Sequence, residues 1–224
     1  LAHIGVLRVL EQEKLPVDII SGSSIGALIG ALWAAGYDSY EIEKIAKGLN
    51  KKNAFFRLLG LQDISAVHRG FFKGDQISRF LTEYLKNMTF QDLKIPVKIV
   101  ATDMLTAEEV VFESGGLVKA IRASISIPGF LRPFPYKGSY LIDGGILDPL
   151  PIKILTDIGI RKITAVNVLP GPKDFIERNE LRRRIFHQSV QQQTHFRRIL
   201  MKAMDRLQRR YSSNIFNVLM NTIQ

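Results

Sequence analysis

Apolar side chains recur along this chain with two distinct periods, one typical of helices and one of strands. An apolar residue at every third or fourth position predicts amphipathic helices over residues 1–14, 39–49, 75–87 and 152–158. Asp75 is expected to cap the third of these helices. Residues 27–35 are almost wholly apolar and predict a buried helix, which is expected to end at Gly36 because glycine favours the position after a helix.

Short runs rich in β-branched residues predict strands at residues 17–20, 97–102, 110–113, 140–142 and 163–168. Predicted helices separate most of them, an order that is typical of a parallel-dominated sheet. We therefore expect an α/β fold in which helices flank a layered, parallel-dominated central sheet. No linker divides residues 1–170, which we assign to one domain, and residues 171–224 are assigned to a separate C-terminal segment.

A glycine-serine turn, Gly22-x-Ser24-x-Gly26, lies between a predicted strand and the apolar helix. Strand, G-x-S-x-G and helix is the layout of a nucleophile elbow, in which a sharp turn exposes the central serine hydroxyl at the edge of a sheet. Gly22 and Gly26 would permit the tight backbone and the close packing of helix against strand. The alternative is an ordinary strand-to-helix turn with Ser23 or Ser24 as the helix N-cap.

A serine nucleophile needs a base, and histidine is one candidate. A triad of the α/β-hydrolase type requires an acid and then a histidine after the serine. His3 precedes the turn, and the other three histidines lie in charged or helical surroundings rather than in loops that follow strands: His68, His187 and His195. We interpret all four as ordinary histidines.

An aspartate is the second candidate base. Asp143 follows the predicted strand 140–142 and precedes Gly144 and Gly145, so its carboxylate would point into a tight loop where a ligand or another backbone segment approaches. Asp-Gly is also a common turn dipeptide. From spacing alone, a catalytic aspartate and an ordinary turn are equally supported.

The G-x-S-x-G and Asp-Gly-Gly motifs together resemble those of the patatin-like phospholipase family. Residues 1–7, 122–130 and 148–151 resemble further segments of that family in the same order, so the resemblance covers residues 1–170. It implies a dyad without histidine, in which Ser24 is the nucleophile and Asp143 the base. The implied function is a serine lipid acyl hydrolase of the phospholipase A or lysophospholipase type that works through an acyl-enzyme.

The resemblance also implies a glycine-rich loop with a basic residue just before the first helix, whose backbone amides form the oxyanion hole. The sequence begins at Leu1, directly after the position of that loop. We therefore expect this chain to be part of a longer protein and to be a poor enzyme by itself. The amide of Ile25, at the start of the elbow helix, is the oxyanion donor that we expect to remain.

Composition narrows the chemistry further. A length of 224 residues with 46% hydrophobic residues suits one α/β domain with a sizeable core. The absence of cysteine excludes disulfides and cysteine-ligated metals, and no His, Asp or Glu cluster has metal-ligand spacing, so we expect no metal and no cofactor. The apolar run 25–35 is too short to span a bilayer.

Positive charge is concentrated near the C-terminus. The whole chain carries a net charge of +10, and residues 178–210 hold ten basic residues against two acidic ones, a net of +8. Apolar residues recur among them at helical spacing, which predicts a basic amphipathic helix over residues 178–211. Contact with an anionic membrane surface and simple packing on the domain are equally supported, whereas nucleic acid is the less favoured partner. We expect a cytoplasmic or peripheral-membrane location.

Two other functions stay open. The dyad would serve equally in a hydrolase of soluble acyl esters or thioesters. A catalytically silent lipid-binding module is the second alternative, because the oxyanion loop is not part of the sequence. Residues 50–74 mix apolar pairs with cations, as expected for either a lipid-contacting lid or a connection that covers the core.

Overall fold

A computed structural model describes residues 2–49 and 74–169 of the chain. Its internal contacts divide the chain into two compact units, Leu1–Val166 and Asn167–Gln224. Almost all of the second unit lies outside the described residues. The fold and the site below belong to the first unit, and the domain boundary expected at residue 170 stays a prediction.

The centre of the first unit is a five-stranded mixed sheet. The strands lie in the order β1-β2-β5-β4, and β3 also pairs with β2. Their bounds are β1 Ile20–Ser23, β2 Val97–Asp103, β3 Glu109–Phe112, β4 Phe134–Tyr136 and β5 Ser139–Asp143. The pair β1–β2 is parallel, and the pairs β2–β3, β2–β5 and β4–β5 are antiparallel.

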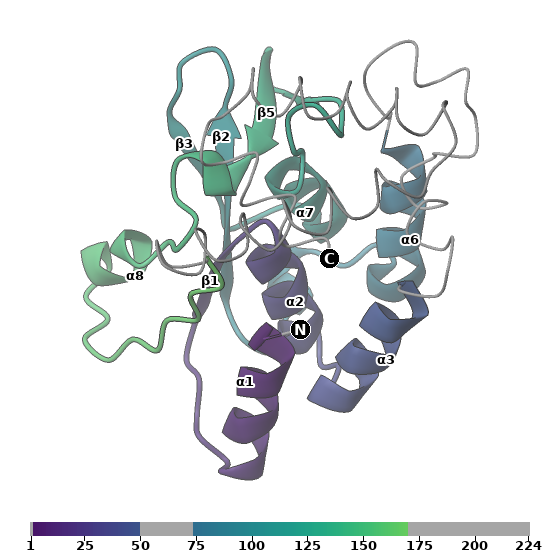
Figure 1. Cartoon of the computed structure of the whole chain (residues 1–224). Coiled ribbons are helices and arrows are strands. Elements are labelled where there is room, and N and C mark those ends of the chain that lie inside the picture. The colour runs from purple at the N-terminus through teal and green to yellow at the C-terminus, as the bar shows by residue number, and fades with distance from the viewer. Residues whose placement is uncertain (1, 50–73, 170–224) are drawn as a thin grey trace, which may run out of the picture. The chain divides into compact units, whose positions relative to one another are not determined.

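Helices pack beside this sheet in two further layers (Figure 1). Helices α2 and α7 contact strands directly, α1 and α3 pack on each other and on α2, and α6 packs on α7. Helix α8 lies away from them, to the left of the strands in the view of Figure 1. The bounds are α1 Ala2–Gln12, α2 Ile25–Ala34, α3 Ser39–Leu49, α6 Asp75–Leu85, α7 Leu117–Ser124 and α8 Lys153–Asp157, with short 3₁₀ turns η1 Phe90–Asp92 and η2 Gly144–Ile146.

Strand β2 is the most buried element of the sheet. Ile99, Val100 and Ala101 are all fully buried, which is the pattern of a central strand covered on both faces. The core continues into α7 through Ile121 and into α2 through Ala27. A central strand of this kind is a rigid platform, and both β1 and β5 end beside it.

The expected α/β fold with helices flanking the sheet is confirmed, and the sheet itself is mixed. Parallel pairing is found at β1–β2, whereas two hairpins, β2–β3 and β4–β5, contribute antiparallel pairs to the described sheet. Hairpins force antiparallel pairing because a short turn reverses the chain. The strand predicted at residues 163–168 is wrong: these residues have no regular secondary structure, and no described strand pairs with them.

Element boundaries differ modestly from those expected. Helix α3 has the predicted bounds, and Gly36, with φ of 105°, follows the end of α2 as expected. Strand β1 begins at Ile20 rather than at residue 17, because its pairing with β2 starts at Ile20 opposite Val97. The cap predicted at Asp75 is wrong, since Gly74 is the N-cap and Asp75 is the first helical residue.

One carboxylate joins the three helices α1, α2 and α3. Glu11 Oε1 accepts hydrogen bonds from Trp33 Nε1, at 2.8 Å, and from the backbone nitrogen of Ser39, at 2.9 Å. A charged acceptor strengthens both bonds relative to neutral pairs. Glu11 therefore fixes the start of α3 and the end of α2 against α1.

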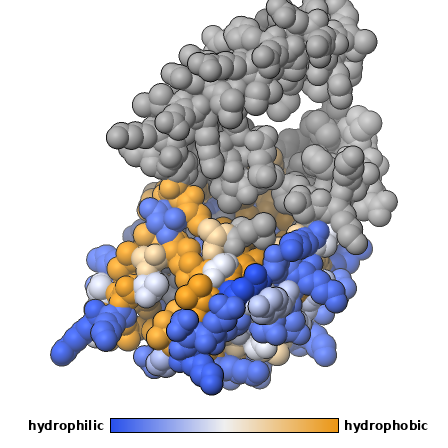
Figure 2. Space-filling model, turned by 60° about the horizontal axis from the view of Figure 1, so that its bottom comes forward, coloured by the Kyte–Doolittle hydropathy of each residue, from blue (hydrophilic) through white to orange (hydrophobic). Residues whose placement is uncertain are grey.

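The surface of the described residues is mixed. Figure 2 shows orange apolar atoms in the middle of the forward face with blue hydrophilic atoms around them. No helix within residues 2–49 and 74–169 is both long enough and apolar enough to cross a bilayer.

Several sequence predictions lie outside the described residues: the lid or covering connection at 50–73, His68, His187, His195 and the basic helix at 178–211.

Candidate active site

Ser24 lies at the turn between β1 and α2 and has an unusual backbone conformation. Its φ of 53° and ψ of −120° belong to a region that non-glycine residues rarely adopt. Such a conformation costs about 1–3 kcal/mol and persists only where surrounding contacts stabilise it. The expected strand, sharp turn and helix are therefore all present around Ser24.

The Ser24 hydroxyl contacts Asp143 rather than the helix that follows. Ser24 Oγ donates a hydrogen bond of 2.5 Å to Asp143 Oδ2, although the two residues are 119 positions apart in the chain. Ser24 is the N-cap residue of α2 by position, as the alternative had it, but its hydroxyl makes no capping bond to the helix. Strand β2 brings the two together, because Ser23 lies opposite Val100 and Asp143 lies opposite Ala101.

Asp143, the last residue of β5, is almost fully buried, with 1% of its surface exposed. Its Oδ1 accepts a hydrogen bond of 2.8 Å from the Gly145 backbone nitrogen, and its own backbone nitrogen donates to the Ser126 carbonyl oxygen at 3.0 Å. Burial raises the pKa of Asp143 to about 6, against the lowering effect of the bonds from Ser24 and Gly145. The carboxylate is thus a stronger proton acceptor than an exposed aspartate and is still mainly ionised at neutral pH.

The glycines around Ser24 differ in what they permit. A Cβ atom on Gly22 would lie 2.7 Å from the Ala27 backbone nitrogen, so only glycine fits there. At Gly26 the nearest atom would be His3 Nε2, at an ordinary 3.7 Å. A further close approach of helix to strand occurs at Gly30, where a Cβ would lie 2.9 Å from Ile20 Cγ2. The sequence pattern did not single out Gly30, which lies inside the apolar helix run.

The loop after Asp143 is also tightly packed. A Cβ atom on Gly144 would lie 2.3 Å from the Val100 carbonyl oxygen and 2.7 Å from Ser23 Oγ. At Gly145 it would lie 3.0 Å from Asp143 Oδ1. Gly144 thus lets the loop approach the middle of β2 and the end of β1, and Gly145 lets it fold close to the Asp143 carboxylate. Asp143 serves as the N-cap of the η2 turn, so it has the expected turn role while it also contacts Ser24.

Two serines at the end of α7 contact this site and were missed by sequence reasoning. Ser124 Oγ accepts a hydrogen bond of 2.8 Å from the Ser24 backbone nitrogen. Ser126 accepts the Asp143 backbone bond, and its hydroxyl accepts a 2.6 Å bond from Arg122 Nη1. The sequence showed this segment only as part of a family-like stretch, and no local pattern reveals a serine that accepts from a backbone 100 positions away.

Positive potential is available next to the Ser24 hydroxyl. Ile25 is the first residue of α2, and the first amides of a helix have no acceptor within the helix. The helix dipole adds a partial positive charge at this end. The Ser24 amide itself donates to Ser124, and the next amide of the elbow is that of Ile25.

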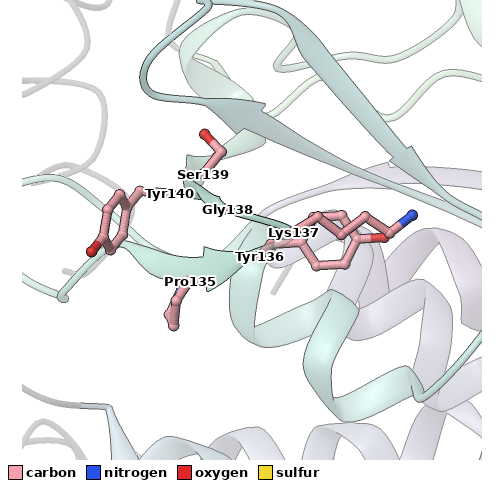
Figure 3. A pocket seen from close by; sticks show the side chains of 6 residues that line it. All are labelled: Pro135, Tyr136, Lys137, Gly138, Ser139 and Tyr140. Carbon is pink, nitrogen blue, oxygen red and sulfur yellow. The ribbon is translucent and has the colours of Figure 1, made fainter.

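The described residues show no group of three His, Cys, Asp or Glu side chains that could hold a metal ion. His3, the one histidine in this part of the chain, has its pKa lowered by burial, and its Nε2 is the atom nearest to a Cβ placed on Gly26. A pocket at the β4–β5 turn is lined by residues 135–140, with the side chains of Lys137 and Tyr136 side by side (Figure 3). Neither Ser24 nor Asp143 lines it, so this pocket is separate from the serine–aspartate contact.

Comparison with known proteins identifies the family of this chain. The family model described as patatin-like phospholipase matches residues 1–156. The chain belongs to the patatin-like phospholipase family. It is 36% identical over 170 residues to a patatin-like phospholipase domain-containing protein of Caenorhabditis elegans, covering 75% of this chain and 12% of that protein.

Two further matches extend the comparison. The chain is 30% identical over 169 residues to a lysophospholipase, NTE1, of Kluyveromyces lactis, again covering 75% of this chain and 12% of the relative. The crystal structure of VipD from Legionella pneumophila matches the fold with a TM-score of 0.52 at 15% identity, over 75% of this chain and 46% of that one. The chain thus spans about an eighth of the length of these two curated relatives, and the likeness to VipD concerns the fold alone.

Proposed function

We propose that this chain is the catalytic part of a lipid acyl hydrolase in which Ser24 is the nucleophile and Asp143 the general base. The 2.5 Å hydrogen bond from Ser24 Oγ to Asp143 Oδ2 is the observation that carries this proposal. It is supported by the strained elbow at Ser24, the burial of Asp143 and membership of the patatin-like phospholipase family.

In the first half of the reaction, Ser24 Oγ attacks the ester carbonyl carbon while its proton moves to Asp143 Oδ2. The carbonyl electrons move onto oxygen and form a tetrahedral oxyanion. That intermediate collapses as the bond to the leaving alcohol breaks, and the alcohol oxygen takes the proton from Asp143. An acyl-serine remains on Ser24.

In the second half, water attacks the acyl carbon and gives its proton to Asp143. Collapse of the second tetrahedral intermediate breaks the bond to Ser24 Oγ, which recovers the proton, and the fatty acid leaves. A carboxylate is far less basic than an alkoxide, so proton transfer must accompany attack rather than precede it. Stabilisation of the oxyanion therefore supplies much of the rate acceleration. The backbone amide of Ile25 is the hydrogen-bond donor that we propose from the Ser24 turn.

The proposal is tested by reaction with a fluorophosphonate probe, which labels activated serines. In the full-length protein, Ser24→Ala is expected to abolish labelling and hydrolysis of short-chain nitrophenyl esters while the circular dichroism spectrum is unchanged. Ser39→Ala is the matched control, because Ser39 is a fully buried serine at the start of α3 and away from the dyad. Wild-type labelling of the Ser24→Ala protein would refute the role of Ser24.

The proposed substrate class is phospholipid or lysophospholipid, since this chain has a relative named a lysophospholipase. Hydrolysis of soluble acyl esters or thioesters is the alternative. Activity that rises sharply when a short-chain phospholipid passes its micellar concentration supports the lipid substrate. Equal activity on monomers and micelles supports the soluble ester.

Peripheral membrane contact through residues 178–211 is a further part of the proposal. It is supported by the net charge of +8 over residues 178–210 and by the helical spacing of their apolar residues. Binding to vesicles that contain anionic lipid, weakened by salt, is the expected result. A protein that binds such vesicles but is not labelled by the fluorophosphonate would instead be the catalytically silent lipid-binding module.

A further inference from the structure

The end of helix α7 contacts both members of the proposed dyad through their backbones. Ser124 Oγ accepts a 2.8 Å hydrogen bond from the nitrogen of Ser24. Two residues later, the carbonyl oxygen of Ser126 accepts a 3.0 Å bond from the nitrogen of Asp143. Both serines are fully buried. One turn of chain thus holds the backbone of the nucleophile and the backbone of the base.

This turn is itself anchored from within α7. Arg122, whose surface is only 4% exposed, donates from Nη1 to Ser126 Oγ at 2.6 Å. Ser126 Oγ in turn donates to the Arg122 carbonyl oxygen at 2.8 Å. Arg122 Nη2 also donates to the Arg132 carbonyl oxygen at 3.2 Å. The geometry of the turn is therefore set by several buried hydrogen bonds rather than by packing alone.

The bond to Ser124 acts on the strained residue. Ser24 has a φ of 53°, and this angle sets the direction of its N–H relative to its own Cβ. A buried acceptor in that direction favours the strained conformation over relaxed ones, in which the N–H would be left without a partner. The same backbone conformation directs Ser24 Cβ and Oγ towards Asp143, where the hydroxyl bond is made.

We infer that Ser124 is a positioning residue for the nucleophile: its hydroxyl holds the Ser24 backbone in the conformation that aims Oγ at Asp143. The inference rests on the proposed function and adds a residue to it. Ser124 acts through Ser24 and has no part in the bonds that form or break. Its loss should reduce kcat and leave KM unchanged, because no substrate contact is altered. The midpoint of the pH profile should move up, because the bond from Ser24 lowers the pKa of Asp143 and would be weakened.

The test uses Ser124→Ala in the full-length protein, with Ser39→Ala as a control for the loss of a buried serine hydroxyl. Misplacement of a reacting group by about 1 Å can cost 100-fold in rate, so kcat and the fluorophosphonate labelling rate are expected to fall by about 10- to 100-fold. KM is expected to stay within about twofold, and the midpoint of the pH profile is expected to move to higher pH as the Ser24–Asp143 bond weakens. Ser124→Cys keeps a weak acceptor of similar size. Its kcat is expected to lie between those of Ser124→Ala and the unsubstituted protein.

Hydrogen exchange at the Ser24 amide supplies a readout that does not depend on catalysis. Faster exchange in Ser124→Ala than in Ser39→Ala supports the bond, and unchanged exchange overturns the inference. Normal kcat and labelling in folded Ser124→Ala also overturn it, as does a loss of rate that Ser39→Ala shares. Absence of labelling in the unsubstituted protein overturns the proposed function instead, so the two failures are distinguishable.

Discussion

Gly22 and Ala27 approach each other so closely that a Cβ atom on Gly22 would lie 2.7 Å from the Ala27 nitrogen and 2.8 Å from its Cα. Both contacts are with backbone, which cannot rotate away as a side chain can. The first turn of α2 therefore folds back over the end of β1. This close approach gives the Ser24 turn its sharpness.

The two glycines that flank Ser24 should consequently respond differently to alanine. Gly22→Ala is expected to destabilise the fold by about 3 kcal/mol, because the overpacked backbone must shift. Gly26→Ala is expected to change stability by less than about 1 kcal/mol, since its methyl group would meet only His3 Nε2 at 3.7 Å and alanine favours helices. Urea unfolding of both variants measures the difference. Equal losses in the two would contradict the packing described at Gly22.

The rate of hydrolysis should depend on the ionisation of Asp143. Its pKa is raised to about 6 by burial, and only the carboxylate can accept the Ser24 proton. We expect kcat/KM to rise with pH through a midpoint near 6 and to level off above pH 7. Measurements with a soluble nitrophenyl ester between pH 4.5 and 8.5 would show this. A flat profile over that range would argue against Asp143 as the base.

Replacing Asp143 with asparagine should remove the base but keep a hydrogen-bonding side chain of the same shape. Turnover is expected to fall by a factor of about 10²–10⁴, the contribution typical of general base catalysis. Single replacement of His68, His187 or His195 by alanine serves as the control and is expected to leave turnover largely unchanged. Collapse of activity in one histidine variant, with near-normal Asp143→Asn, would favour a triad instead.

The same substitution should stabilise the fold at alkaline pH. The folded-state pKa of Asp143 lies above the ordinary aspartate value of 3.8, so folding favours the neutral carboxyl. Stability is therefore lost as the pH rises from about 4 to about 6 and stays at the lower level above pH 6. Asp143→Asn stays neutral and should raise the melting temperature at pH 8. The gain should shrink between pH 6 and pH 4 and vanish below it. Thermal unfolding at several pH values measures the gain in melting temperature. An equal gain at pH 3.5 and pH 8 would show that ionisation of Asp143 is not its cause.

Ser24 and Asp143 could be singled out from sequence because each has a local signature. Ser24 lies in a G-x-S-x-G turn between a strand and an apolar helix, and Asp143 lies at a strand end before two glycines. Neither signature reports the distance between the two residues, which is set by the register of β1 and β5 on β2. The spatial distance between Ser24 and Asp143 is therefore seen only in the structure.

Most of the features that sequence reasoning missed depend on partners far along the chain. Residues 163–168 have strand-like composition but no described strand beside them, and a strand needs a neighbour to bond. Ser124 has an ordinary place at a helix end, and its role arises from a residue 100 positions earlier. At Asp75 a good capping residue is present, but the chain enters α6 one residue earlier through the left-handed Gly74, with φ of 76°.

The Glu11 junction has a practical consequence for following this protein in solution. Trp33 is the chain's one tryptophan, and its indole nitrogen donates to the Glu11 carboxylate at the meeting of three helices. Indole emission shifts to longer wavelength when the ring enters water, so separation of α1 from α2 should be visible without any added dye. The fluorescence of the unsubstituted chain would therefore report the helical layer, while ester turnover would report the end of the sheet where Ser24 and Asp143 meet.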